Sequence, residues 1–191
     1  MELITGLICF GAVALGAAIL YAVLYNSLIG KKNQVEYAFS GVDVQLKKRH
    51  DLIPNLVATV KQYMEHERGL LERITELRSR AMNPNLPEDE RLQAESALSG
   101  ALRSLWVAVE NYPQLRANEN FMHLQASLNE IEEQIAAARR AYNAAVTDYN
   151  NAIEMFPTNI IASTMGLKRR AVFEAEQTER AVPSVSQLFQ Q

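Results

Sequence analysis

Residues 3–29 contain no charged side chain and are mostly apolar, and two lysines, Lys31 and Lys32, follow almost at once. A helix of this length reaches roughly 40 Å at about 1.5 Å per residue, which is long enough to cross a bilayer. A helix satisfies its own backbone groups in lipid, which a loop cannot do. The pattern predicts a transmembrane anchor over residues 1–30.

Beyond the anchor, apolar residues recur at alternating steps of three and four, as on amphipathic helices. One such stripe begins at Val35, another runs from Leu92 to Val109, and a third is sustained for about five heptads from Phe121 to Phe156. The spacing predicts helices over about 33–81, 88–111 and 117–156.

Short turns rich in asparagine and proline separate these stripes, at residues 83–87 and 111–113. Long helices joined by short turns pack antiparallel. The chain beyond the anchor is rich in Ala, Leu, Glu, Gln and Arg, which are good helix formers, and it lacks a sustained alternation of apolar and polar residues, so the sequence predicts an all-α protein. Because so little chain separates the anchor from the first stripe, the single transmembrane helix is expected to continue into an elongated antiparallel bundle of long helices, over residues 31–157. Pro54 is expected to kink or break the first of these helices, and Asp51 to cap it if it restarts.

Residues 158–191 form the last segment, which begins after Pro157. We expect a connection over residues 158–166, a short helix over residues 167–181 and a mostly polar tail. Leu188 and Phe189 lie together near the end of that tail. They suit a docking peptide, and the alternative is a frayed terminus.

The first residues favour a retained anchor over a cleaved signal peptide. A signal peptide has a basic leading region, whereas Met1 and Glu2 carry no positive side chain. Lysine and arginine lie only on the C-terminal side of the span, which predicts an external N-terminus and a cytoplasmic bundle. A periplasmic bundle is the alternative.

Small residues in the span form two small-xxx-small spacings, Ala12/Gly16 and Ala14/Ala18. Such spacings let membrane helices approach closely, so these residues are candidates for helix packing in a homo-oligomer. Ordinary anchor composition is the alternative.

Several polar residues lie on or beside the apolar stripes. In helical bundles such residues fix the register of packing, and we prefer that role to a ligand site. The candidates are Asp43, Arg49, Asp51, Asn55, Asn143 and Asn150.

No residue pattern nominates a catalytic, cofactor or metal site. The three histidines share no metal-ligand spacing, the single cysteine, Cys9, lies in the span, and phosphate-binding and nucleophile motifs are absent. A formal net charge of −3 and short basic clusters give no support to nucleic-acid binding. The sequence therefore points away from an enzyme and needs no cofactor.

The run NQVEYAFSGVDVQLKKRHDLIPNLVATVKQYMEHE over residues 33–67 resembles the signature of the LemA family. The segments over residues 112–125, 138–157 and 173–176 are similar to that family as well. One departure is Leu167, where an aromatic residue commonly follows the glycine. The resemblance implies a single-pass bacterial membrane protein with a bundle of long helices and a short external N-terminus. It implies no reaction.

Taken together, these patterns favour a non-enzymatic scaffold that self-assembles at the membrane surface. The alternative is a monomeric or dimeric adaptor for another membrane protein, such as a protease or a signalling system. An enzyme with a composite site between helices is the third possibility. The expected partners are the lipid bilayer and further copies of the chain.

Overall fold

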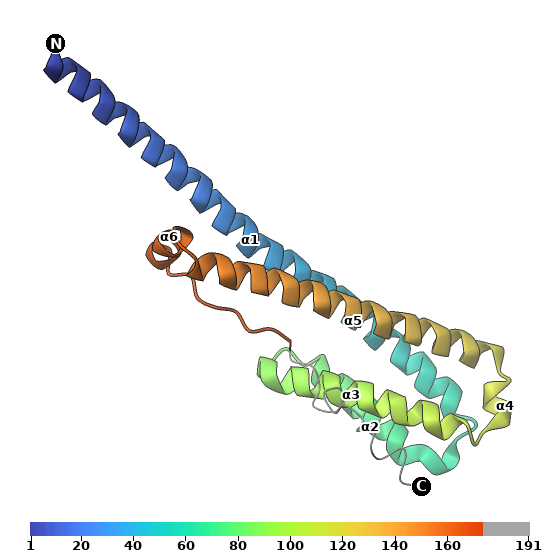
Figure 1. The fold of residues 1–191 in the computed structure, drawn as a ribbon. Coiled ribbons are helices and arrows are strands. Elements are labelled where there is room, and N and C mark those ends of the chain that lie inside the picture. Colours follow the sequence, from blue (N-terminus) through green and yellow to red (C-terminus); the bar gives the residue numbers. More distant parts are fainter. Residues whose placement is uncertain (174–191) are drawn as a thin grey trace, which may run out of the picture. The chain divides into compact units, whose positions relative to one another are not determined.

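The computed structural model describes residues 1–173, and all regular structure in that range is helical. Figure 1 shows its helices in order along the chain. They are α1 (Glu2–Lys61), the 3-10 turn η1 (Glu65–Glu67), α2 (Arg68–Ala81), α3 (Glu88–Val109), α4 (Pro113–Arg116), α5 (Glu119–Glu154) and α6 (Thr158–Thr164). The predicted all-α class and the helical bundle are confirmed.

The helices divide into two compact units. The anchor unit contains residues 1–40 and the described residues from 138 onward, so it holds the first part of α1, the last part of α5, and α6. The bundle unit contains residues 41–137, with the rest of α1 and α5 and all of α2, α3 and α4.

The bundle unit has one main apolar core, to which each of its long helices contributes. The apolar residues of the predicted stripes make up most of this core, which explains why the periodicity located the helices. Its fully buried members include Leu56, Val60, Ile74, Leu98, Leu105, Phe121 and Leu128.

The helix expected over residues 33–81 is divided, and the division is not at Pro54. α1 passes through Pro54 and ends at Lys61, after which the chain turns and continues through η1 into α2. Backbone amides of Tyr63 and Met64 both donate to the carbonyl of Val60, which tightens this turn. Met64 is fully buried, and its burial favours this reversal of chain direction. The turn itself contains no glycine or proline that would have predicted it. α1 therefore does not break at Pro54, and the kink expected there stays a prediction.

The C-terminal segment also differs from expectation. Residues 158–164, expected as a connection, form α6, while residues 167–173, expected to begin a helix, have no regular structure. Gly166 has a φ of 64°, a left-handed value that ends the helix and that glycine adopts without strain. The remainder of the expected helix and the tail with Leu188 and Phe189 lie outside the described residues.

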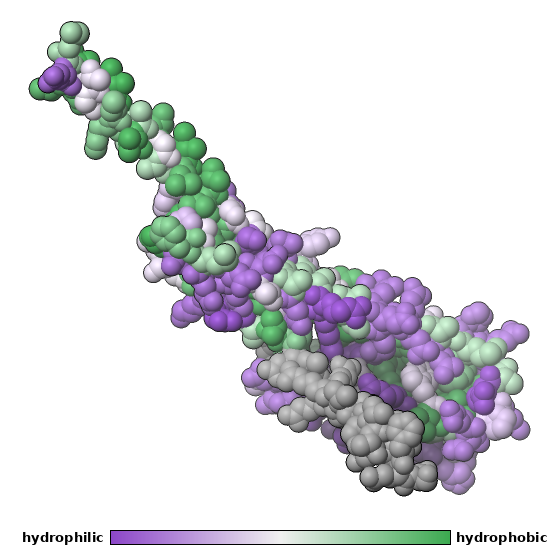
Figure 2. All heavy atoms as spheres, viewed as in Figure 1, coloured by the Kyte–Doolittle hydropathy of each residue, from purple (hydrophilic) through white to green (hydrophobic). Residues whose placement is uncertain are grey.

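One described helix, α1, is long and apolar enough to cross a membrane, and none of its most apolar part is buried. Figure 2 shows hydrophobic side chains covering nearly all of the N-terminal part of α1. This exposure suits a helix whose surroundings are lipid.

Candidate functional site

The four small residues expected to pack membrane helices lie on the exposed surface of the span. Ala12, Ala14, Gly16 and Ala18 are all exposed, and a Cβ atom added to Gly16 would meet no other atom within 4 Å. The described chain therefore leaves these positions free. Whether a second helix packs there stays a prediction.

Within the anchor unit, α1 packs against α5 and α6 from the C-terminal end of its uncharged run onward. Leu28 is fully buried against Ile161 and Ala162 of α6. Farther along α1, Val35 packs on Val146 and neighbouring residues of α5. The end of the apolar run is thus tied to the rest of the unit by ordinary hydrophobic contacts.

A ladder of side chains on α5 holds the segment that follows α6. The side-chain amide of Asn150 donates to the carbonyl of Arg170 (2.9 Å) and accepts from its backbone N–H (3.0 Å). Asn143 makes the same two bonds with Phe173, at 2.9 and 2.8 Å. Each asparagine therefore satisfies both backbone groups of one residue, as a neighbouring β-strand would.

Two tyrosines, each one residue before an asparagine, donate further hydrogen bonds to the same segment. The hydroxyl of Tyr149 donates to the carbonyl of Lys168 (3.1 Å), and that of Tyr142 donates to the carbonyl of Ala171 (3.3 Å). The ring of Tyr142 also packs on the ring of Phe173, with centroids 4.9 Å apart. These contacts explain the local repeat of Tyr-Asn pairs in the sequence.

The distance between the two Tyr-Asn pairs on α5 matches the distance between the backbone groups that they bind. Seven residues of α-helix rise about 10.5 Å, and three residues of extended chain cover about 10 Å. Tyr-Asn pairs seven residues apart on α5 therefore meet backbone groups three residues apart on the segment. We call Tyr142, Asn143, Tyr149 and Asn150 the Tyr-Asn ladder.

A buried polar cluster lies in the core of the bundle unit. Arg49 of α1 has no exposed side-chain surface and forms an ion pair with Glu95 of α3. One of its terminal nitrogens also donates to Glu132 of α5 (2.7 Å) and to the hydroxyl of Ser99 (2.6 Å). A single arginine thus joins three helices, and its role in setting their register stays a prediction.

Glu95 is held in its charged form although it is buried. Burial by itself raises the pKa of this carboxyl, but a hydrogen bond from His50 and the positive charge of Arg49 outweigh burial, and the net pKa lies below the usual value. His50 Nε2 lies 2.9 Å from a Glu95 oxygen. Two consecutive residues of α1, Arg49 and His50, therefore both contact this carboxylate.

The continuity of α1 through Pro54 has a visible cause. Proline has no N–H to donate to the carbonyl four residues earlier, which here belongs to His50. Arg78 of α2 donates its Nε hydrogen to that carbonyl at 2.7 Å. The lost helical bond is thus replaced by a bond from the neighbouring helix.

The other polar candidates on α1 do not join helices among the described contacts. Asp43, Asp51 and Asn55 are exposed. Asp51 lies inside α1 and therefore caps nothing, and its partner is Lys47, 3.3 Å away on the surface. Such an exposed pair contributes little stability, and a register-setting role for these three residues stays a prediction.

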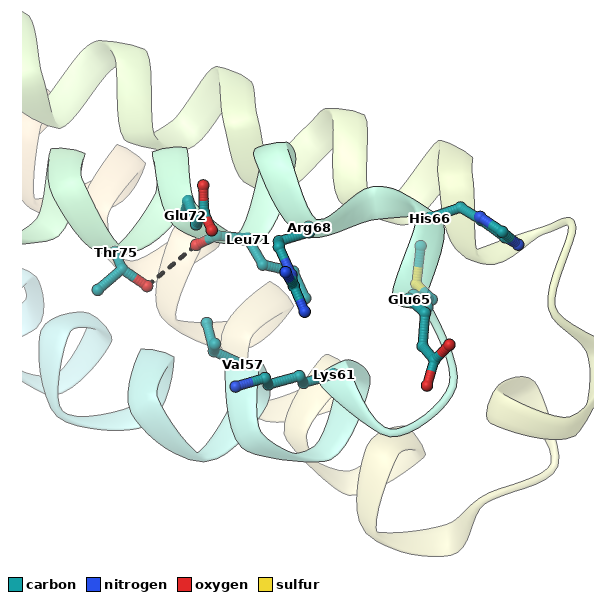
Figure 3. Close-up of a pocket in the computed structure, with 9 residues that line it drawn as sticks. Val57, Lys61, Glu65, His66, Arg68, Leu71, Glu72 and Thr75 are labelled. Atoms are coloured by element: carbon teal, nitrogen blue, oxygen red, sulfur yellow. Dashed lines mark hydrogen bonds between the residues drawn. The ribbon is translucent and has the colours of Figure 1, made fainter.

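A hollow of about 760 Å³ opens between the end of α1 and α2 (Figure 3). Val57, Met64 and Leu71 give it an apolar floor, and charged side chains of both signs line its rim: Lys61, Glu65, Arg68 and Glu72.

Among residues 1–173, no group of three His, Cys, Asp or Glu side chains is placed to hold a metal ion.

Comparison with known proteins places this geometry in a family. A match to the LemA family covers residues 38–187. The chain is 26% identical to Protein LemA of Metamycoplasma hominis, over 85% of this chain and 74% of that protein.

Two further relatives are magnetosome proteins. The chain is 24% identical to magnetosome protein MamQ 2 of Paramagnetospirillum magneticum and 23% identical to magnetosome protein MamQ of Magnetospirillum gryphiswaldense. Each match covers 87% of this chain and 71% of the relative. The family match, the apolar N-terminal helix and the helical bundle agree, and the chain belongs to the LemA family.

Proposed function

We propose that this protein is a non-enzymatic, membrane-anchored scaffold that assembles into a homo-oligomer at the bacterial membrane surface. The observation that carries the proposal is the continuity of α1 from Glu2 to Lys61. This helix supplies the candidate span and also core residues of both compact units. A helix built in this way connects the candidate span to the rest of the chain without an intervening loop.

The polar chemistry of the interior supports a structural role. The buried charges of Arg49 and Glu95 are engaged with each other and with neighbouring helices. The Tyr-Asn ladder is engaged with the backbone of the chain itself. Catalysis needs polar groups that are free to meet a substrate, and these groups are already occupied.

The arrangement of small residues in the span supports assembly. Successive residues of a helix are about 100° apart around the axis, so Ala14/Ala18 lie about 200° from Ala12/Gly16. The two pairs therefore occupy nearly opposite faces, and each face is open to the close approach of another helix. One span would then contact a neighbour on each side, as a ring or a row of copies requires.

We further propose that the bundle lies in the cytoplasm, beneath the inner membrane. The basic residues that flank the span, Lys31 and Lys32, lie on the bundle side. A C-terminal fusion to a fluorescent protein that matures only in the cytoplasm tests this orientation. Fluorescent cells are expected, and a dark but fully expressed fusion would place the bundle in the periplasm.

The assembly is tested by placing a large side chain on one small-residue face. Gly16→Leu fills the Ala12/Gly16 face, whereas Gly6→Leu adds the same side chain about 100° away from both faces. Neither added Cβ atom meets another atom of the chain. Light scattering of the detergent-extracted protein is expected to show a smaller particle for Gly16→Leu only.

Two results would contradict the assembly proposal. If the unmodified protein is a monomer over a wide concentration range, no homo-oligomer exists. If both leucine variants keep the full particle size, assembly does not use the Ala12/Gly16 face.

The second candidate function is that of an adaptor for another membrane protein, and the hollow near Lys61 favours it. Its apolar floor and mixed-charge rim suit a short amphipathic segment of a partner. Chemical crosslinking in native membranes distinguishes the two functions. A stoichiometric foreign partner supports the adaptor, and crosslinks between copies alone support the scaffold.

A further inference from the structure

The corner between α5 and α6 carries large apolar side chains that nothing in the described chain covers. Met155, Phe156 and Ile160 have exposed fractions of 63%, 79% and 59%. They lie close together along the chain, whereas the opposite face of α6 is buried. Scattered apolar residues need no explanation, but three large exposed ones between residues 155 and 160 do.

The buried face of α6 fixes where this corner lies along α1. Ile161 and Ala162 pack on Leu28, with Leu24 beside them. Leu24 and Leu28 are close to the C-terminal end of the uncharged run. In Figure 1, α6 accordingly lies at the end of α5 that is nearer the N-terminal part of α1.

The length of the run places this level at a membrane boundary. About 20 helical residues fill a hydrocarbon core of about 30 Å, so a helix that enters the core just after Glu2 leaves it near Ala22. Tyr21 and Tyr25 stack on each other with ring centroids 6.3 Å apart at the same level. Tyrosine is typical of the interfacial layer, and the first charged side chain beyond it is Lys31.

Backbone carbonyls of the corner have hydrogen-bond donors within the chain, which suits an apolar environment. The hydroxyl of Thr158 donates to the carbonyls of Ala152 (2.5 Å) and Met155 (2.9 Å), and the amide of Asn159 donates to the carbonyl of Met155 (2.8 Å). Two carbonyls at the end of α5, those of Ala152 and Met155, are therefore bonded. Unbonded backbone groups oppose entry into lipid.

We propose that this corner is a second membrane-contact site, in which Met155, Phe156 and Ile160 enter the boundary between headgroups and acyl chains. It rests on the proposal that α1 spans the bilayer. The occupant is the lipid surface because the corner is continuous with the exposed apolar surface of α1 at the level where that helix leaves the hydrocarbon. Anchoring then uses two elements, and the second one restricts rotation of α1 about its own axis.

The test measures the depth of single fluorescent probes in lipid. The full chain carrying Cys9→Ser receives one cysteine, labelled with an environment-sensitive fluorophore, at Ile160, Val13 or Val44. Val13 lies inside the span. Val44 is an exposed apolar residue of α1 outside the apolar run and is the matched control. Each protein is placed in phosphatidylcholine–phosphatidylglycerol vesicles containing lipids with a nitroxide quencher near the top or the end of the acyl chain.

The proposal predicts that the Ile160 probe is quenched by the shallow nitroxide at least roughly twofold more than the Val44 probe. The Val13 probe should be quenched best by the deep nitroxide. Quenching at Ile160 no stronger than at Val44, together with a quenched Val13 probe, overturns the second contact and leaves the anchor intact. An unquenched Val13 probe overturns the anchor itself, and with it the basis of this proposal.

A protein occupant gives a different result. If a second copy covers the corner, the Ile160 probe will emit at shorter wavelength but resist quenching by lipid. Diluting the protein in lipid will then reverse that emission shift. Either observation would contradict the lipid proposal.

Discussion

The bond from Arg78 to the carbonyl of His50 offers the sharpest test of how α1 tolerates Pro54. The proline removes the backbone donor of one helical bond, and the Nε hydrogen of Arg78 fills the vacancy at 2.7 Å. We therefore predict that Arg78→Met destabilises the protein because it leaves a carbonyl inside the bundle without its donor. An unsatisfied buried group costs about 1–3 kcal/mol.

The decisive measurement is a double-mutant cycle with Pro54→Ala. Alanine restores the N–H group at position 54, so the carbonyl of His50 regains a helical partner. Arg78→Met should then cost less than about 1 kcal/mol, and the coupling energy should be about 1–2 kcal/mol. Pro54→Ala alone should leave the fold intact and hold or raise the melting temperature.

Thermal unfolding of the full chain in detergent, followed by circular dichroism, supplies the numbers. For a chain of this size, 1 kcal/mol shifts the melting temperature by about 2–4 °C, so a cost of about 1–3 kcal/mol for Arg78→Met should lower it by roughly 2–12 °C. Arg80→Met is the control, since Arg80 is exposed on the same helix. If Arg78→Met costs the same with proline and with alanine at position 54, the compensation argument is wrong.

Three further predictions concern the buried polar groups. Arg49→Met should lower the free energy of unfolding in urea by about 3–5 kcal/mol, because it leaves the buried charge of Glu95 without a partner of opposite sign. A cost below about 1 kcal/mol would refute a structural ion pair. Asn150→Ala should speed hydrogen exchange at the amide of Arg170 by about 5–30-fold, as loss of two hydrogen bonds implies, whereas Asn151→Ala on the exposed side should not. Because the folded pKa of Glu95 is depressed, its contribution is present above the usual value of about 4.5 and is lost as the pH falls toward the folded pKa. Glu95→Gln should therefore show a smaller fall in melting temperature over that acidic range.

Periodicity located the helices well because most stripe residues face a common core. It could not place the turn after Lys61, because the burial of Met64 favours that turn and no local breaker marks it. It also misassigned residues 158–173. The segment after α6 has helix-forming composition, but its backbone groups are bound by asparagines of α5. Local propensity cannot anticipate a distant partner of that kind.

Of the polar residues expected to matter, Arg49, Asn143 and Asn150 join separate elements. Asp43, Asp51 and Asn55 resemble them in type, and only their exposed position on α1 separates the two groups. Glu95 was missed, although a signal existed: it occupies a seam position of α3 between Leu92 and Leu98. A charge at such a position requires a buried partner of opposite sign.

The Tyr-Asn ladder has a consequence for how this part of the sequence is free to vary. The asparagines bind main-chain atoms of residues 170 and 173, so many different side chains at those two positions preserve the bonds. Proline alone is forbidden there by chemistry, because it has no amide hydrogen to donate. The asparagines have no such freedom, since only a carboxamide both donates and accepts in this arrangement. For these hydrogen bonds, mutational tolerance should therefore be asymmetric: most substitutions at residues 170 and 173 keep the bonds, whereas substitutions of Asn143 or Asn150 remove them.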